Sequence, residues 1–134
     1  MTAASKSIYN RIVPEGTVRI PVKAAKTIYK GTIVCVDATG YALPGADTAG
    51  LIFMGLALED CDNSAGSSGD KDVLIVTSGL ITMSYTGAIT QADMGSNCTI
   101  SDDNNVADAG ATTNDIVVGK LIRFTENNKV VIKI

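Results

Sequence analysis

Residues 32–40 read TIVCVDATG, and this stretch decides the fold class. Ile33 to Val36 form an apolar run rich in β-branched side chains, which predicts a short strand covered on both faces. Asp37 to Gly40 then supply the residue types of a tight turn. A four-residue strand that ends at once in a turn is typical of an all-β protein built from many short strands.

Further strand-like stretches lie on both sides of this run. Residues 17–22 alternate between polar and apolar positions, and Pro21 among them predicts a half-buried strand at the edge of a sheet. Residues 51–58 are apolar on both faces, with Gly55 predicting a bulge or a close approach of two backbones. The remaining strand-like stretches are residues 73–76, 81–85, 116–124 (interrupted by Gly119) and 130–134.

Helical signals are nearly absent. The best case is residues 90–93 (TQAD), which resemble a capping box, and Gly95 ends that turn. Three polar stretches, residues 44–50, 59–72 and 101–115, are expected to be loops. We therefore predict an all-β fold, a compact β-barrel or β-sandwich of short strands, with at most one short helical turn.

The chain divides by charge and by pattern near its start. Residues 1–30 carry six basic side chains and one acidic one, whereas residues 31–134 carry five basic and thirteen acidic ones. Weak periodicity and the Pro14-Glu15-Gly16 break separate the first residues from the alternating strands. We expect an extended N-terminal arm at residues 1–16 and a single β domain at residues 17–134.

Catalysis is not expected, because the chain has no histidine and so lacks the commonest general base. Ser68 and Lys71 have the spacing of an SxxK pair, but that motif needs a helix and here Gly69 and Asp70 intervene. The acidic loop beginning at Asp60 resembles an EF-hand only in part. We expect no catalytic residue, no cofactor and no metal site.

The three cysteines are isolated and odd in number, which argues against a disulfide framework. Cys35 is expected in the core, and Cys61, in a polar loop, is expected to be exposed. An acidic chain without basic clusters interleaved with aromatic residues is not expected to bind nucleic acid. No apolar run approaches the length of a membrane span, so no membrane association is expected.

An ordered series of short motifs carries a family resemblance. The series is YKGTIVCVDATGYALPG (29–45), FMGLALED (53–60), VLIVTSGL (73–80), ITQADMGSNCTISDDNNV (89–106), VVGKLI (117–122) and KVVIKI (129–134). Over residues 27–134 the chain resembles the small capsid decoration (cement, head-stabilising) proteins of tailed phages and prophages. The resemblance implies a non-enzymatic virion protein that binds the major capsid protein on the outer capsid surface. It also implies a homotrimer, made in the cytoplasm of the host bacterium.

The resemblance assigns no role to the arm, so contact residues are predicted from the residues themselves. Apolar side chains in a weakly patterned arm and basic side chains near it are suited to capsid or inter-subunit contacts. They are Ile8, Tyr9, Arg11, Ile12, Val13 and Arg19. The alternative is a head-fibre base or a host- or glycan-binding surface module, which favours aromatic residues in exposed loops. The long acidic loops contain none.

Overall fold

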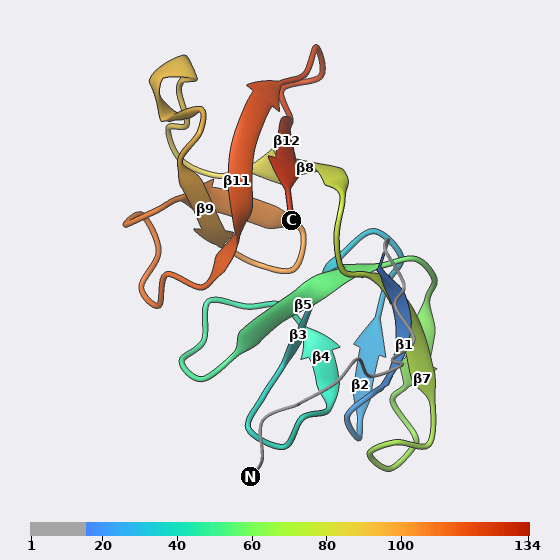
Figure 1. Ribbon diagram of the computed structural model, residues 1–134. Helices are drawn as coiled ribbons and strands as arrows, with labels where there is room; N and C mark the ends of the chain where they lie inside the picture. The colour runs from blue at the N-terminus through green and yellow to red at the C-terminus, as the bar shows by residue number, and fades with distance from the viewer. Residues whose placement is uncertain (1–15) are drawn as a thin grey trace, which may run out of the picture.

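The computed structural model describes residues 16–134, and these form an almost entirely β structure (Figure 1). The predicted fold class is confirmed: short strands build sheets and a closed barrel, with one short helical turn. The predicted arm lies outside the described residues except for Gly16. The strands are β1 (Thr17–Pro21), β2 (Lys26–Ile28), β3 (Ile33–Val36), β4 (Ala42–Pro44), β5 (Ile52–Ala57), β6 (Cys61–Asn63), β7 (Asp72–Val76), β8 (Leu80–Tyr85), β9 (Asn97–Ile100), β10 (Asn105–Asp108), β11 (Val117–Phe124) and β12 (Val130–Lys133), with the 3-10 turn η1 (Gln91–Asp93) between β8 and β9.

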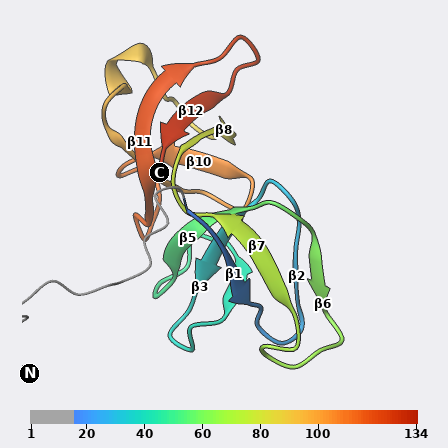
Figure 2. The same ribbon diagram turned by 45° about the vertical axis from the view of Figure 1, so that its right-hand side comes forward.

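The first half of the described chain forms a five-stranded sheet in the order β1-β7-β5-β3-β4, accompanied by the two-stranded ribbon β2-β6. The second half forms a closed barrel in the order β10-β8-β12-β11-β9. The barrel stands above the sheet in both views (Figures 1 and 2). Within the barrel, β8 and β10 pair in parallel, whereas the other neighbours are antiparallel.

Strand β3 is apolar throughout because its two faces join different cores. Ile33 and Cys35 belong to the apolar cluster that fills the barrel, together with barrel residues such as Leu121 and Ile132. Val34 belongs to a second cluster on the other face of the sheet, with Ile75 among its members. Successive side chains on a strand point to opposite faces, so a strand buried between two cores needs apolar residues at every position.

Two local predictions are confirmed in detail. Opposite Val34 and Cys35 the register of β5 shifts near Gly55, where a Cβ atom would lie 2.1 Å from the carbonyl oxygen of Val76. Gly55 therefore marks both a bulge and a close approach of two backbones. At η1, the Thr90 N–H donates to Asp93 Oδ2 at 2.7 Å, as a capping box requires.

The expectation that residues 59–72 and 101–115 are loops throughout is wrong. β6 pairs with β2, and β10 lies between β9 and β8. The pairing of β6 turns Cys61 into the second core, so Cys61 is buried and not exposed as expected. Polar neighbours on both sides of Cys61 concealed this strand, because only one face of the short β6 is covered.

Some apolar side chains expected in the core are exposed. Val18 is 43% exposed, Ile52 is 61% exposed and Leu58 is 40% exposed. Val18 lies on β1, at the edge of the sheet, where no described element covers it. The sequence patterns correctly predicted strands at β1 and β5, but the cover over each strand face depends on parts of the chain distant in sequence.

The two halves are also joined by a carboxylate that sequence patterns did not reveal. Asp47, in the connection from β4 to β5, accepts hydrogen bonds from the N–H groups of Thr113 and Asn114, both at 2.8 Å. The Asn114 side chain also donates to the Asp47 carbonyl at 3.0 Å. These hydrogen bonds, of which the one from the Thr113 N–H has the largest effect, hold the pKa of Asp47 below its ordinary value.

Replacing Asp47 by Ala should therefore loosen the connection from β10 to β11. We expect faster amide hydrogen exchange at Thr113 and Asn114 and a lower melting temperature at pH 7. Because the pKa of Asp47 is depressed, its contribution is complete above the ordinary value of 3.8 and is lost as the pH falls through the lower folded value. The difference in melting temperature between wild type and Asp47→Ala should thus shrink at about pH 3. A difference that is equal at both pH values would contradict this role.

Candidate interaction surface

Strand β1 leaves one row of backbone groups unpaired among the described residues. At its two ends, the Gly16 carbonyl accepts from the Thr77 N–H at 2.7 Å, and the Val22 N–H donates to the Lys71 carbonyl at 2.9 Å. Antiparallel pairing alternates, so even-numbered positions face β7 and odd-numbered positions face away from it. The open edge of β1 therefore consists of the backbone N–H and C=O groups of Thr17 and Arg19 and the carbonyl of Pro21.

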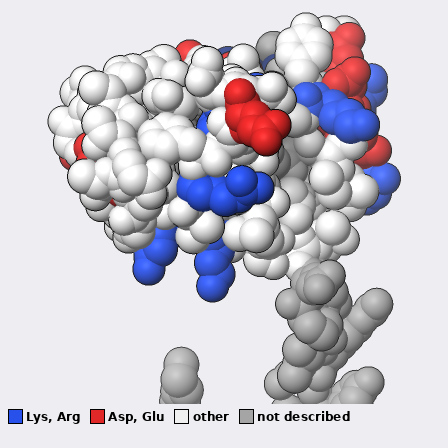
Figure 3. All heavy atoms as spheres, turned by 90° about the horizontal axis from the view of Figure 1, so that it is seen from above, with Lys and Arg blue, Asp and Glu red and all other residues white. Residues whose placement is uncertain are grey.

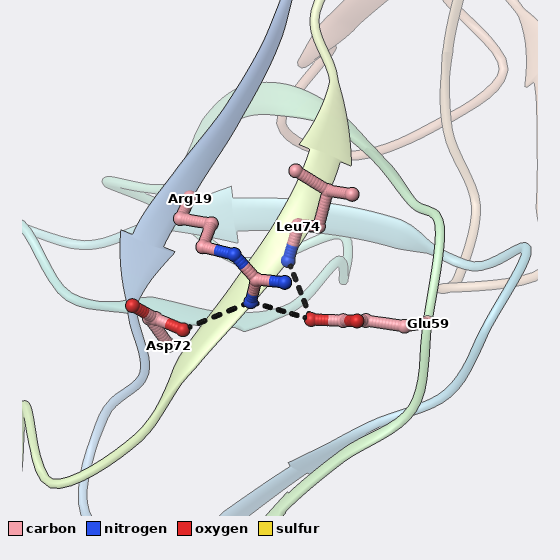
Figure 4. Close-up of polar contacts among 4 residues, drawn as sticks. All are labelled: Arg19, Glu59, Asp72 and Leu74. Atoms are coloured by element: carbon pink, nitrogen blue, oxygen red, sulfur yellow. Dashed lines mark hydrogen bonds and ion pairs between the residues drawn. The ribbon is translucent and has the colours of Figure 1, made fainter.

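Arg19 is the one predicted contact residue that lies among the described residues. Acidic side chains of the same chain bind its guanidinium (Figure 4). Nη1 donates to Glu59 Oε1 at 2.9 Å and to Asp72 Oδ1 at 3.1 Å. The same Glu59 oxygen accepts the N–H of Leu74 at 3.2 Å. The hydrogen bond that Arg19 donates to Glu59, followed by the one that it donates to Asp72, raises the pKa of Arg19.

This network fixes β1 to β7 and to the segment that follows β5. The Arg19 side chain is 52% exposed, so solvent screens its ion pairs and their contribution to stability is small. A charged side chain and a proline on an edge strand also discourage indiscriminate pairing with other chains.

The other predicted contact residues, Ile8, Tyr9, Arg11, Ile12 and Val13, lie outside the described residues. What the structure shows is where the chain enters the domain. The Gly16 N–H donates to Ser78 Oγ at 3.2 Å, in the connection from β7 to β8. Gly79 in the same connection exchanges backbone hydrogen bonds with Ile134. Gly16, the first described residue, therefore lies close to the carboxyl-terminal residue, between sheet and barrel (Figure 2).

The Ser68–Lys71 pair considered for catalysis has a structural role here. Ser68 Oγ accepts the Ala24 N–H at 3.0 Å, while Lys71 Nζ donates to the Asp62 carbonyl at 2.7 Å. Cys35 and Cys98 are fully buried, and burial raises the pKa of each thiol to about 11. Thiols with such pKa values are poor nucleophiles at neutral pH.

The acidic loop between β6 and β7 borders a polar hollow of about 380 Å³. Four exposed aspartates line the hollow together with Cys61, Gly69 and Lys71: Asp60, Asp62, Asp70 and Asp72. Within residues 16–134, no group of three or more Asp, Glu, Cys or His side chains is arranged to hold a metal ion. We name this feature the acidic hollow.

Sequence reasoning missed a second charged surface on the barrel. Lys120 on β11 lies directly opposite Lys133 on β12, which in turn lies opposite Leu80 on β8. The alternation of Ile81, Met83 and Tyr85 was a usable signal that Leu80 points outward. The pairing of the two lysines had no such signal, because β11 carries a bulge that shifts its register.

In the part of the chain that the structure describes, no helix is long and apolar enough to cross a membrane. Searches for similar proteins gave no match to this chain among protein-family models, curated proteins or solved structures.

Proposed function

We propose that this protein is a non-enzymatic structural component of a phage particle, which binds the outer surface of the assembled capsid and stabilises it. The proposal rests on the resemblance of residues 27–134 to capsid decoration proteins and on one structural observation. That observation is the open edge of β1, which begins where the arm enters the domain. Its partner would be the major capsid protein, and its location the surface of the virion.

An open strand edge offers a specific way to bind an extended segment of another protein. Unpaired N–H and C=O groups form a ladder with an added strand, and side-chain pockets then select the sequence. On β1 these groups lie beside Val18, an apolar side chain that is 43% exposed. An arm and an adjacent edge strand can bind two parts of a lattice at once, which multiplies modest contacts.

The rest of the described surface also suits contact with protein. Large apolar side chains are exposed on several strands, including Ile52 at 61%, Leu80 at 67% and Val117 at 48%. Viewed from the barrel end, a broad area is largely uncharged (Figure 3). Depletion of charged residues is characteristic of the centres of protein interfaces.

Cosedimentation with empty capsids of the parent phage tests the proposal. The intact protein should bind expanded shells tightly and unassembled coat protein weakly, because a cement site spans more than one subunit. Deleting residues 1–15 should weaken capsid binding by about tenfold or more. The deletion keeps Gly16, whose contacts with Thr77 and Ser78 belong to the folded domain.

A second variant separates the edge of β1 from the arm. Thr17→Pro removes one outward N–H and leaves the pairing of β1 with β7 intact, so it should weaken capsid binding without unfolding the domain. Raising salt should weaken binding further if the basic leading segment meets acidic capsid groups, because charges are screened over about 8 Å at physiological ionic strength. If the intact protein fails to sediment with capsids at any salt, the alternative of a head-fibre base or host-binding module takes its place.

A further inference from the structure

The outer face of the barrel carries a row of side chains that is unfavourable in an isolated chain. Lys120, Lys133 and Leu80 occupy directly opposite positions on β11, β12 and β8, and all three are exposed. We call them the lysine row. Ile122 on β11, two residues from Lys120, is 38% exposed. The row thus combines two positive charges with uncovered apolar surface.

Two lysines at directly opposed positions on neighbouring strands repel each other. Among the described residues, neither Lys120 nor Lys133 forms an ion pair, since the ion pairs found involve Arg19 and Lys23. The next residue along this register is the exposed Asn97, which is uncharged. A carboxylate-bearing surface placed on the row would relieve the repulsion and cover Leu80, which is 67% exposed.

We propose that the lysine row of one copy docks on the acidic hollow of a second copy of this chain. The complementary charge of the two surfaces favours a second copy. The hollow has four exposed aspartates and one lysine, and only Asp72 of the four forms an ion pair, with Arg19, among the described residues. The carboxylates keep oxygen atoms available for a partner while they hold the loop. Asp60, for example, accepts the Lys30 N–H through Oδ1.

The two surfaces lie far apart on the molecule. The row belongs to the barrel, whereas the hollow lies at the β6–β7 loop, at the end of the sheet away from the barrel (Figure 2). Contacts between different surfaces of identical chains are head-to-tail, and they generate a ring if the rotation closes. The family resemblance implies a homotrimer without saying which surfaces meet. This inference names those surfaces, and it does not require a capsid.

Sedimentation velocity and native mass spectrometry of the full chain test the inference at low and at high salt. The wild type should self-associate with increasing concentration, and raising salt should weaken the association. Lys120→Glu combined with Lys133→Glu should weaken it by about tenfold or more. Lys129→Glu is the matched control, since this exposed lysine lies outside the row, and it should associate like the wild type.

A mixing experiment identifies the complementary surface. Asp60→Asn combined with Asp62→Asn removes charge from the hollow and keeps oxygen acceptors for the Lys30 and Ser64 N–H groups. Each double variant alone should associate more weakly than the wild type. In a mixture with the wild type, the intact hollow of the row variant can bind the lysine row of a wild-type copy, whereas its altered row binds no further copy. Such a mixture should therefore form short complexes that do not grow. Circular dichroism melts should show that both variants are folded.

Three results would overturn the inference. One is a wild type that stays monomeric at all concentrations and salts, and another is a row variant that associates as strongly as the wild type. The third is a hollow variant that associates like the wild type, which would assign the row to a different acidic surface. Capsid cosedimentation of the same variants is a separate readout, so failure of self-association leaves the cement proposal to its own test.

Discussion

Replacing Asn63 by Asp is expected to lower the free energy of unfolding by about 3–5 kcal/mol at pH 7. Asn63 is 1% exposed, and its Nδ2 group donates to the carbonyl oxygens of Val22, Lys23 and Ser67 at 3.0–3.2 Å. This amide fastens the β6–β7 loop to the segment that follows β1. A carboxylate in its place would face three carbonyl oxygens with no hydrogen to donate.

The side chains and backbone around Asn63 leave no room for an introduced carboxylate to move to other partners. Its Oδ1 atom is buried and accepts no hydrogen bond, and a Cβ atom on Gly66 would lie 2.1 Å from it. Burial without a donor disfavours the ionised acid, so the introduced carboxyl should have a raised pKa. The sign follows from linkage: the protonated form is tolerated below the ordinary pKa of about 4, and the loss of stability grows as the pH rises through the folded pKa.

Thermal melts at about pH 4 and pH 7 measure this effect. At pH 7 the midpoint should fall by about 10–20 °C for a chain of this size, and by less at pH 4. Asn127→Asp is the matched control, because Asn127 is exposed in the turn between β11 and β12 and should change the midpoint little. A fall that is equal for Asn63 and Asn127 would show that the buried amide does not fasten the loop.

Replacing Gly119 by Ala should lower the free energy of unfolding by about 2–3 kcal/mol. A Cβ atom at this position would lie 2.2 Å from the carbonyl oxygen of Lys133 and 2.9 Å from Cγ2 of Ile132. Both atoms belong to β12, the neighbouring strand of the closed barrel. The two strands must therefore separate, and a closed barrel cannot relax one pair of strands without disturbing the next.

Urea unfolding of Gly119→Ala and Gly40→Ala separates a steric clash from backbone strain. Gly40 has a φ of +81°, and a Cβ atom there would meet nothing within 4 Å, so Gly40→Ala should cost only about 1 kcal/mol. A Gly119→Ala variant that is no more destabilised than Gly40→Ala would contradict the close approach of β11 to β12. The slope of free energy against urea should be the same for both variants, since the change concerns the folded state.

Sequence patterns alone determined the fold class and the positions of the apolar strands. The run at Ile33–Val36 predicted a strand covered on both faces, and its side chains enter two separate cores. The capping box before Gly95 predicted the helical turn η1. Such features can be predicted because strand alternation, β-branched side chains and turn residues act over a few neighbouring positions.

The candidate surfaces were predicted only in part. Pro21 correctly indicated that β1 lies at the edge of a sheet. The sequence placed Arg19 among the contact residues, but its guanidinium lies between Glu59 and Asp72, forty and fifty-three positions away along the chain. No local window contains that information, because the ion pairs exist only once β1 lies beside β7.

Tertiary structure alone decided the remaining features, and the reason is the same for each. The strand character of β6 and the burial of Cys61 follow from pairing with β2. The hydrogen bonds between Asp47 and Asn114 join the sheet to the barrel. Lys120 lies opposite Lys133 only because a bulge in β11 sets the register of its pairing with β12. A side chain's own neighbours in sequence fix which strand face it occupies, whereas the long-range pairing of strands fixes what that face meets.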